Sequence, residues 1–353
     1  MPKCMAKNNK PKIRFAVVGC GHIGKRHAEM ILRNPAAELV AMCDVLPVEA
    51  LGLNSIFEQM DTSSQPLFFS SLDALLSSGL SIDVINICVP NGLHAALSVQ
   101  ALKADCHLVV EKPMALTQTD AESILQTAEQ AKRMVFCVMQ NRYSPPSVWI
   151  KDLVESGRLG RIFLVQINCF WNRDHRYYKK GNWHGTQDMD GGTLFTQFSH
   201  FIDLMYWLLG DISNIRARFA DFIHQDMTDF EDTGVVSFEF NQGGMGCFNY
   251  STAVWDKNME SSITIIAEHG SIKIGGQYMN EVEYCHVKDY EMPILPPTNP
   301  GNDYGAYKGS AQNHHYVIDN VVQVLDGQEA SITTNAFEGY KVVDIIRRIY
   351  DAE

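Results

Sequence analysis

Long apolar runs are missing from this sequence of 353 residues. Its most apolar long stretch, Phe201–Leu209, is short and contains Asp203, whereas a membrane-spanning helix needs about 20 apolar residues. Residues 1–12 are basic and polar with no apolar segment behind them, so they do not resemble a signal peptide. The sequence therefore predicts a cytoplasmic protein without a membrane partner.

Paired cysteines and metal-ligand clusters are also missing. The nine cysteines include no C-x-x-C motif, and Cys88 and Cys137 lie within apolar runs, which is typical of small buried side chains in a reducing compartment. The histidines include the pairs His314-His315 and His22/His27. Neither pair has a cysteine or carboxylate set at ligand spacing, so we expect no metal site. On a helix, two adjacent histidines point about 100° apart, so one of His314 and His315 should face inward.

Positive charge is scarce. Lysine and arginine number 29 against 41 acidic residues, which gives a formal net charge of −12. Such a surface repels a phosphate backbone on average, so we expect no nucleic-acid partner. An anionic small molecule would need a local basic cluster. The length suits two domains of about 150 residues each.

The first part of the chain alternates strand and helix patterns. We expect strands at residues 13–18, 38–43, 82–88, 107–110 and 134–139. Their near-continuous apolar character indicates burial on both faces. We expect helices at residues 23–32, 72–77, 93–103 and 120–132. The last opens with a predicted capping box at Thr119 and Glu122. This alternation predicts an α/β domain with a doubly wound parallel sheet over residues 12–140.

The pattern changes after residue 139. Ser144-Pro145-Pro146 reads as a break, and the Pro- and Gly-rich residues 289–305 read as a long loop. Segments of alternating polarity lie at residues 161–170, 235–240, 244–252 and 263–268. Alternation of this kind is typical of antiparallel strands with one face on a core.

Three helices accompany these strands. They are expected at residues 192–209, 312–325 and 336–350. We therefore predict a second, α+β domain with an open, mostly antiparallel sheet over residues 141–333. The C-terminal helix, residues 334–353, is expected to pack back on the first domain.

A glycine motif lies between the first expected strand and the first helix. Gly19-Cys20-Gly21-His22-Ile23-Gly24 matches G-x-G-x-x-G in the context that this motif requires. Gly19 would permit the tight turn, Gly21 would let the backbone approach a pyrophosphate, and Gly24 would let the helix pack on the strand. His22 and Ile23 open the helix, whose free N–H groups favour a phosphate. The motif predicts a dinucleotide-binding Rossmann domain.

Asp44 indicates which dinucleotide binds. It ends the second expected strand, twenty residues after Gly24, and no arginine follows it directly. A carboxylate at this place accepts hydrogen bonds from an adenosine ribose and repels a 2′-phosphate. The alternative interpretation is a solvated turn residue. The sequence predicts NAD as the cofactor, in preference to NADP.

Glu111-Lys112-Pro113 follows the strand at residues 107–110. Ligands bind at the carboxyl ends of strands in an open α/β sheet, where a lysine can contact substrate oxygens and stabilise or transfer a proton; a lysine pointing to solvent is the alternative. Three parts of the chain resemble the glucose-fructose oxidoreductase, inositol dehydrogenase and rhizopine-catabolism family, Gfo/Idh/MocA. They are the glycine motif, the stretch CVPNGLHAALSVQALKADCHLVVEKPMALT (88–117) and the later GGTLFTQFSHFID. The resemblance covers nearly the whole chain.

The resemblance implies an NAD(P)-dependent oxidoreductase acting on CH–OH groups, with a Rossmann domain followed by an open-sheet domain. It implies that Lys112 lines the catalytic cleft and that the Lys112–Pro113 peptide bond is cis. The further cofactor-binding residues that it implies are Val89, Pro90, Asn91, His94 and Glu111, the last beside the nicotinamide half.

Thr196, His200, Asp203 and Trp207 share one stripe of the helix expected at residues 192–209. A polar stripe on an apolar helix needs partners, so a hydrogen-bonded structural histidine is one interpretation. In the resembled family, however, the histidine at the position of His200 takes the hydroxyl proton while hydride leaves the same carbon. Many members carry an aspartate where this chain has Thr196. Thr196 followed by Gln197 resembles the subgroup acting on nucleotide-linked sugars, and Asp203 either orients His200 or forms a structural bond.

Residues 171–184 carry four formal positive charges and four aromatic residues with one acidic residue. This segment is either a solvated loop or a clamp in which basic groups meet a carboxylate or diphosphate and aromatic faces meet a sugar or base. Residues 141–143 could face the same cleft. The candidate substrate residues are Arg142, Tyr143, Arg173, Tyr178, Trp183, Thr196, Gln197 and Asp203.

The closing stretch, YGAYKGSAQNHHYVIDNVV and ITTNAFEGYKVVDIIRRIY, resembles that of bacterial dehydrogenases that oxidise C3 of UDP-N-acetylglucosaminuronic acid in surface-polysaccharide synthesis. The leading hypothesis is an NAD-dependent dehydrogenase that converts a ring hydroxyl of a sugar nucleotide to a ketone, with Lys112 and His200 as catalytic residues. The alternatives are a free-sugar or inositol dehydrogenase, and a catalytically silent NAD-binding regulator. The resemblance also suggests a homodimer or homotetramer formed through the C-terminal sheet.

Overall fold

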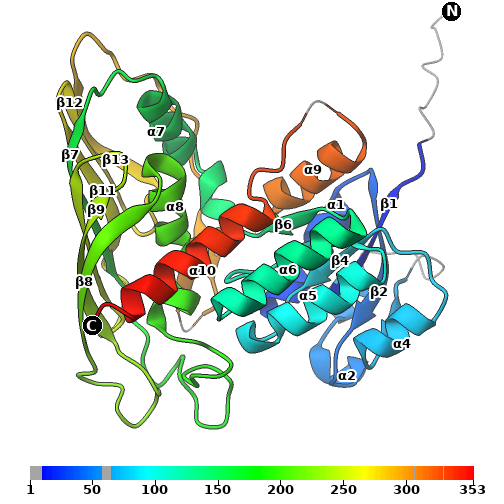
Figure 1. Cartoon of the computed structure of the whole chain (residues 1–353). Helices are drawn as coiled ribbons and strands as arrows, with labels where there is room; N and C mark the ends of the chain where they lie inside the picture. The colour runs from blue at the N-terminus through cyan, green and yellow to red at the C-terminus, as the bar shows by residue number, and fades with distance from the viewer. Residues whose placement is uncertain (1–9, 58–64, 306, 329) are drawn as a thin grey trace, which may run out of the picture.

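The structure, a computed structural model, describes residues 10–57, 65–305, 307–328 and 330–353. Residues 1–9, part of the polar start in which no signal peptide is expected, lie outside the described residues. Two sheets stand side by side, and helix α10 (Ala336–Tyr350) runs from one toward the other (Figure 1). None of the described helices is both long and apolar enough to cross a membrane.

The first sheet is parallel, as predicted, with six strands in the order β3-β2-β1-β4-β5-β6. Its strands are β1 (Ile13–Val18), β2 (Ala37–Cys43), β3 (Leu67–Phe69), β4 (Val84–Ile87), β5 (His107–Val110) and β6 (Val135–Cys137). Alternate residues of β1 enter two different cores, with Phe15 and Val17 on one side and Ala16 and Val18 on the other. The sheet is therefore buried on both faces, which explains its continuous apolar strands.

Helices cover both faces of this sheet. They are α1 (His22–Arg33), α2 (Val48–Leu51), α3 (Asn54–Phe57), α4 (Leu72–Ser77), α5 (His94–Lys103), α6 (Gln118–Ala131) and α9 (His314–Leu325). The predicted capping box at Thr119 and Glu122 is wrong. Helix α6 begins two residues earlier, where the Thr117 side chain accepts a hydrogen bond from the Asp120 N–H at 3.1 Å.

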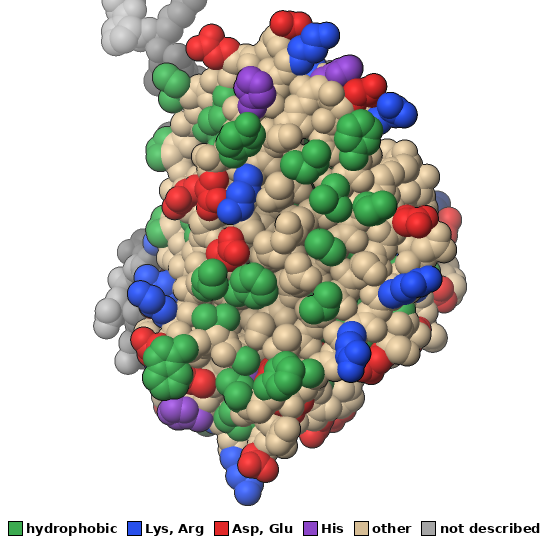
Figure 2. All heavy atoms as spheres, turned by 90° about the vertical axis from the view of Figure 1, so that its left-hand side faces the viewer, with side chains coloured by type: hydrophobic (Ala, Val, Ile, Leu, Met, Phe, Trp, Pro, Cys, Tyr) green, Lys and Arg blue, Asp and Glu red, His purple; other side chains and the backbone are tan. Residues whose placement is uncertain are grey.

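The second sheet has seven strands in the order β13-β12-β11-β7-β10-β9-β8. They are β7 (Ile162–Phe170), β8 (Ile212–Ala220), β9 (Thr233–Phe240), β10 (Met245–Ser251), β11 (Glu260–Ala267), β12 (Gly270–Gly275) and β13 (Glu281–Val287). All neighbours are antiparallel except β7 and β10, which confirms the predicted mostly antiparallel sheet. Its outer face carries scattered apolar side chains, with most charged side chains nearer its edge (Figure 2).

The inner face of the second sheet packs on the helical segment that the sequence places at residues 192–209. This segment begins as a π-helical turn, Leu194–Phe198, and continues as α8 (Ser199–Leu209). Phe198 and Phe201 pack edge-on against Trp171 at the end of β7, with ring centroids 5.5 and 5.7 Å apart. A fixed apolar contact therefore holds the polar residues of this segment against the sheet.

Helix α7 (Pro145–Glu155) occupies the place where a break was expected. The first N–H groups of a helix have no partner within the helix, so proline, which lacks an N–H, is tolerated there. Pro145 and Pro146 therefore start helix α7 and do not break the chain. Helix α10 is capped by a capping box of Asn335 and Glu338. It contacts both halves of the chain, because it packs against α6 and α8 and the Gln118 side-chain amide donates to Asp344 at 2.6 Å. A two-stranded hairpin, β14 (Gly301–Asp303) and β15 (Lys308–Ala311), completes the fold.

Candidate active site

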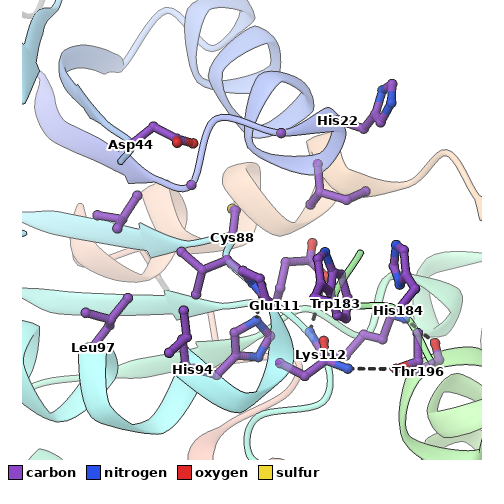
Figure 3. A pocket seen from close by; sticks show the side chains of 18 of the residues that line it. His22, Asp44, Cys88, His94, Leu97, Glu111, Lys112, Trp183, His184 and Thr196 are labelled. Carbon is purple, nitrogen blue, oxygen red and sulfur yellow. Dashed lines mark hydrogen bonds between the residues drawn. The ribbon is translucent and has the colours of Figure 1, made fainter. Parts of the chain in front are cut away.

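A cavity of about 780 Å³ lies between the two sheets. Its walls come from the carboxyl ends of β1, β2, β4 and β5 on one side, and from the segment after β7, the π-helical turn and the β14–β15 hairpin on the other. Figure 3 shows the residues of one part of its lining. The cavity therefore lies where an open α/β sheet binds ligands.

The glycine motif lies at one end of this cavity. Gly19 has a φ of +89°, and a Cβ there would lie 2.5 Å from the Cys88 carbonyl oxygen. A Cβ on Gly24 would lie 1.8 Å from the Gly19 carbonyl oxygen, so this glycine allows α1 to approach β1 and does not line the cavity. A Cβ on Gly21 would meet nothing within 4 Å. The space that Gly21 leaves open lies before the N-terminus of α1, so the motif fits a dinucleotide pyrophosphate.

Asp44 lies at the carboxyl end of β2, beside the glycine motif (Figure 3). Its Oδ2 accepts the Cys20 N–H at 2.7 Å and its Oδ1 accepts the Leu46 N–H at 2.9 Å. These bonds hold the carboxylate at the cavity wall, in the position from which it can accept ribose hydroxyls.

The segment after β4 and the segment after β5 meet in the middle of the cavity. The Lys112–Pro113 peptide bond is cis, as predicted. His94 joins the two segments, because its Nδ1 lies 2.6 Å from the Pro113 carbonyl oxygen and its Nε2 lies 2.8 Å from that of Val89. Val89, Pro90, Asn91, His94 and Glu111 all line the cavity, together with His22 and Ile23.

Glu111 is held by two histidines. Its Oε1 lies 2.9 Å from His27 Nε2 and 3.5 Å from His314 Nε2, and Asn86 donates to His27 Nδ1 at 2.8 Å. These donors keep the pKa of the buried Glu111 carboxyl well below its usual value, against the opposing effect of burial. Of the two adjacent histidines, His314 is buried and His315 is partly exposed.

The ligand atoms of His27, Glu111 and His314 all lie within 4.8 Å of one another. The spacing argument against a metal site did not anticipate this cluster, because its three members come from α1, the end of β5 and α9. The hydrogen bond between His27 and Glu111 and the contact of His314 with the same carboxylate hold this cluster together.

Lys112 and His200 face the same cavity. The Lys112 ammonium donates to the Thr196 carbonyl oxygen at 2.6 Å (Figure 3). Burial lowers the pKa of Lys112 from its usual value, although Glu111 and Asp190 oppose the shift. Burial and the charge of Lys112 lower the pKa of His200 well below its usual value, so this imidazole is neutral at neutral pH. A neutral imidazole beside an amine can take part in proton transfer.

The opposite wall is built around Arg173 and Gln197. The Arg173 guanidinium is buried and lies over the rings of Trp171, Tyr177 and Tyr307 at 4.8 to 5.2 Å. Its Nε donates to Gln197 Oε1 at 2.7 Å. The Gln197 side-chain nitrogen is buried and has no hydrogen-bond partner in the described part of the chain. Of the candidate substrate residues, Arg173, Trp183, Thr196 and Gln197 line the cavity.

The remaining candidate substrate residues do not line the cavity, in contrast to the expectation. Arg142 is buried in an ion pair with Asp203 and a second with Glu338, each at 2.6 Å. Tyr143 stacks on Tyr316 with ring centroids 5.5 Å apart. Tyr178 packs edge-on against His224 at 5.2 Å. The polar stripe of the site helix is thus divided, because Thr196 and His200 face the cavity while Asp203 faces Arg142.

Several residues that the sequence did not single out also line the cavity or its wall. Tyr304 and Tyr307, on the hairpin, stack with ring centroids 5.0 Å apart. Asp190 is completely buried behind Thr196, whose hydroxyl donates to its carboxylate. The pair of tyrosines around Gly305 was a usable signal, whereas nothing in the local sequence marks Asp190 as buried.

Two family models match the chain. The Gfo/Idh/MocA oxidoreductase family model with an NAD-binding Rossmann fold matches residues 13–139, and the Gfo/Idh/MocA C-terminal domain model matches residues 148–273.

Solved structures and curated proteins agree with these matches. The WlbA dehydrogenase of Bordetella pertussis, solved with NADH and UDP-GlcNAcA, is 31% identical over 97% of this chain and 96% of its own, with a TM-score of 0.81. The WlbA dehydrogenase of Chromobacterium violaceum, solved with the same ligands, is 31% identical over 98% and 94%, with a TM-score of 0.83. Inositol 2-dehydrogenase of Rhizobium meliloti is 24% identical over 64% of each chain.

The nucleotide fingerprint, the Glu-Lys-Pro segment and these matches lead to one conclusion. The chain belongs to the Gfo/Idh/MocA family and is an NAD-dependent oxidoreductase of the sugar dehydrogenase type, acting on CH–OH groups.

Proposed function

We propose that the protein oxidises a ring hydroxyl of a negatively charged, nucleotide-linked sugar to a ketone in surface-polysaccharide synthesis. The leading candidate is C3 of UDP-N-acetylglucosaminuronate. The two WlbA dehydrogenases that were solved with UDP-GlcNAcA support this substrate class, and Arg173 is the observation in this chain that carries it.

Arg173 supports an anionic substrate because its charge is buried without a carboxylate partner among the described residues. Apart from the Gln197 side chain, its acceptors are the Asn172 carbonyl, the Asn258 amide oxygen and the Lys308 carbonyl, at 2.6, 3.2 and 3.0 Å. All of these acceptors are neutral, and a buried charge is costly unless it is paired. A carboxylate or diphosphate in the cavity would supply the missing counter-charge.

Aromatic side chains support a sugar or base as part of the same ligand. The rings of Trp183 and His184 lie tilted to each other with centroids 3.8 Å apart, and those of Tyr304 and Tyr307 stack with centroids 5.0 Å apart, on the walls of the cavity. Such faces suit the apolar side of a sugar ring or the plane of a base.

His200 and Lys112 would carry the proton chemistry. The neutral His200 imidazole accepts the hydroxyl proton, and the Lys112 ammonium donates to the same oxygen through an N–H not used by Thr196. Bound NAD supplies the acceptor for the hydride that leaves the same carbon. Gly21, Asp44, Asn91 and Glu111 are the residues that would hold the dinucleotide in reach of that carbon.

A turnover screen tests the proposal. UDP-N-acetylglucosaminuronate, the corresponding free sugar acid and inositol are each incubated with the protein and NAD. NADH absorbance is followed both in solution and on the protein, since the cofactor could stay bound. We expect reduction only with the nucleotide sugar. Turnover of free sugars or inositol would instead identify a free-sugar or inositol dehydrogenase and leave the charge of Arg173 unexplained.

A catalytically silent NAD-binding regulator would bind NAD and reduce it with none of these compounds. The presence of both Lys112 and His200 in the cavity argues against this alternative. Isothermal titration with NAD in the same samples separates a silent protein from a misfolded one.

We also propose that a second copy of the chain covers the outer face of the second sheet. Leu164, Val235, Met245 and Ile266 are all more than a third exposed on that face. The side chains of Gln166 and Asn249, which lie between them, are uncharged. Met245→Glu should lower the mass measured by light scattering to that of a smaller assembly, while Phe337→Glu, on α10, should not. An unchanged mass for M245E would contradict this interface.

A further inference from the structure

Asp190 is a buried carboxylate that Thr196 connects to the proposed catalytic lysine. The residue is completely inaccessible to solvent and precedes Gly191 and Gly192, whose positive φ angles turn the chain into the π-helical turn. The Thr196 hydroxyl donates to one carboxylate oxygen. The Gly185 N–H donates to the other at 2.7 Å, and His184 Nδ1 lies 3.8 Å from it. One carboxylate thus joins the loop after β7, residues 171–189, which we call the substrate loop, to the helical segment that carries Thr196 and His200, the site helix.

The backbone of this segment is fixed to the cofactor half of the cavity. Asn91 donates to the Asp190 carbonyl oxygen at 2.9 Å and to the Thr196 hydroxyl at 2.7 Å. The Gly92 N–H donates to the Met189 carbonyl at 3.0 Å, and a Cβ on Gly92 would lie 2.3 Å from the Asp188 carbonyl oxygen. The close approach therefore requires glycine at position 92.

Asp190 reaches Lys112 through a short connection. Thr196 donates its hydroxyl to Asp190 and accepts the Lys112 ammonium on its own carbonyl oxygen, the latter at 2.6 Å. The other charged or titratable groups around Lys112 are Glu111 beside it in the chain, His94 of α5, His200 of α8 and Arg173 on the opposite wall. Of the groups just named, Glu111 is the one that joins Asp190 in favouring a positive charge on Lys112. The Glu111 carboxylate, however, is already shared with His27 and His314.

We propose that Asp190 is a positioning residue that keeps Lys112 in its ammonium form and fixes it relative to the substrate loop. Arg173 and Asp190 then act on Lys112 in opposite directions, because one is a buried cation and the other a buried anion. An anionic substrate that pairs with Arg173 would offset the repulsion that Arg173 exerts on Lys112, so substrate binding itself would favour the ammonium form. This inference rests on the proposed role of Lys112.

The test measures the titration of the Lys112 amine without turnover. The intact protein is reductively methylated with ¹³C, and the Lys112 signal is assigned by its absence in Lys112→Met. In Asp190→Asn we expect the amine to titrate at lower pH, by about one pH unit, because a nearby opposite charge has been removed. Asp229→Asn is the matched control. Asp229 is exposed, lies in contact with the same loop through the Gln187 N–H at 3.1 Å, and is not among the groups that act on Lys112.

If D190N does not fold, Asp190→Ser replaces it with a smaller uncharged side chain. The Lys112 amine should titrate at lower pH in that variant as well. Asp190→Glu should return the titration toward that of the wild type, because it restores the charge. With an active substrate, the alkaline limb of kcat/KM should move to lower pH in D190N and stay in place in D229N.

The two proposals fail in different ways. A shifted amine titration without turnover of any sugar would leave the inference about Asp190 standing and overturn the proposed function. Turnover with an amine titration that is the same in D190N, D190S and the wild type would overturn the inference about Asp190.

Discussion

Arg142 and Asp203 form a bidentate ion pair in which both side chains are buried. Arg142 Nε donates to Asp203 Oδ2 at 2.8 Å and Nη2 donates to Oδ1 at 2.6 Å. The remaining nitrogen donates to Glu338 of α10 at 2.6 Å and to the Thr333 carbonyl at 2.8 Å. The pair joins α8 to the segment before α7 and to α10. We therefore assign it to the stability of the site helix and not to substrate binding.

Asp203→Ala should destabilise the protein strongly. Removing one partner of a buried pair leaves an uncompensated charge and costs about 3–5 kcal/mol in the free energy of unfolding. Urea denaturation measures this loss. Glu155→Gln is the control, since its ion pair with Lys151 at 3.0 Å involves an exposed carboxylate and is worth only about 0.5 kcal/mol. A large increase in KM with an unchanged free energy of unfolding would instead indicate that Asp203 takes part in substrate binding.

Arg173→Met should weaken the binding of a charged sugar nucleotide while leaving NAD binding unchanged. Methionine keeps an apolar stem among the rings of Trp171, Tyr177 and Tyr307 but removes the charge, which has no counter-ion among the described residues. A charge-assisted hydrogen bond is worth about 1.5–3 kcal/mol, so we expect KM to rise by roughly 10- to 100-fold. Equal effects on charged and neutral sugars would indicate that Arg173 only supports packing.

Asp44→Ala should lower the affinity for NAD and reduce the preference of the protein for NAD over NADP. The carboxylate is held by the Cys20 and Leu46 N–H groups at the end of β2, where it would accept ribose hydroxyls and repel a 2′-phosphate. We expect a loss of about 10-fold or more in the affinity for NAD, measured by the fluorescence of bound NADH and NADPH. Glu38→Gln, an exposed change on the same strand, should have no effect.

Lys112→Met and His200→Asn should each reduce turnover by about 10²–10⁴-fold while NAD still binds, the range for a general acid or base.

In the wild type, the acid limb of kcat/KM should lie below pH 6.5. Burial and Lys112 lower the pKa of His200, so the imidazole keeps its neutral, proton-accepting form until the pH falls through that lowered pKa. The alkaline limb should lie below pH 10.5, because burial lowers the pKa of Lys112. Turnover that survives either substitution would remove that residue from the proposed mechanism.

The parts of the site that sequence could predict are those built by neighbouring residues. Gly19, Gly21 and Asp44 act through a strand, a turn and a helix that are contiguous in the chain, so their spacing carries their geometry. The cis Lys112–Pro113 bond was implied by the family resemblance, part of which a continuous stretch of sequence carries.

The missed features depend on packing between distant segments. Arg142 appeared free to meet a substrate because its partner Asp203 lies 61 residues away. Glu111 pairs with His27, 84 residues away, which no local spacing reveals. Strand β8 was missed because its pairing with β9 shifts register between Ser213 and Arg216, and this irregularity breaks the alternation on which strand prediction depends.

Helix α10 has a consequence for the order in which the chain can fold during synthesis. It brings Glu338 to Arg142, and Tyr350 to Glu231 and to the Leu194 N–H. A nascent chain that has already made both sheets still lacks these partners and leaves the surface that receives Val342 and Ile346 uncovered. Domains generally fold as units while they emerge from the ribosome. In this protein, however, Arg142 and the start of the segment that carries His200 lack these partners until α10 has emerged from the ribosome, even when both sheets have formed.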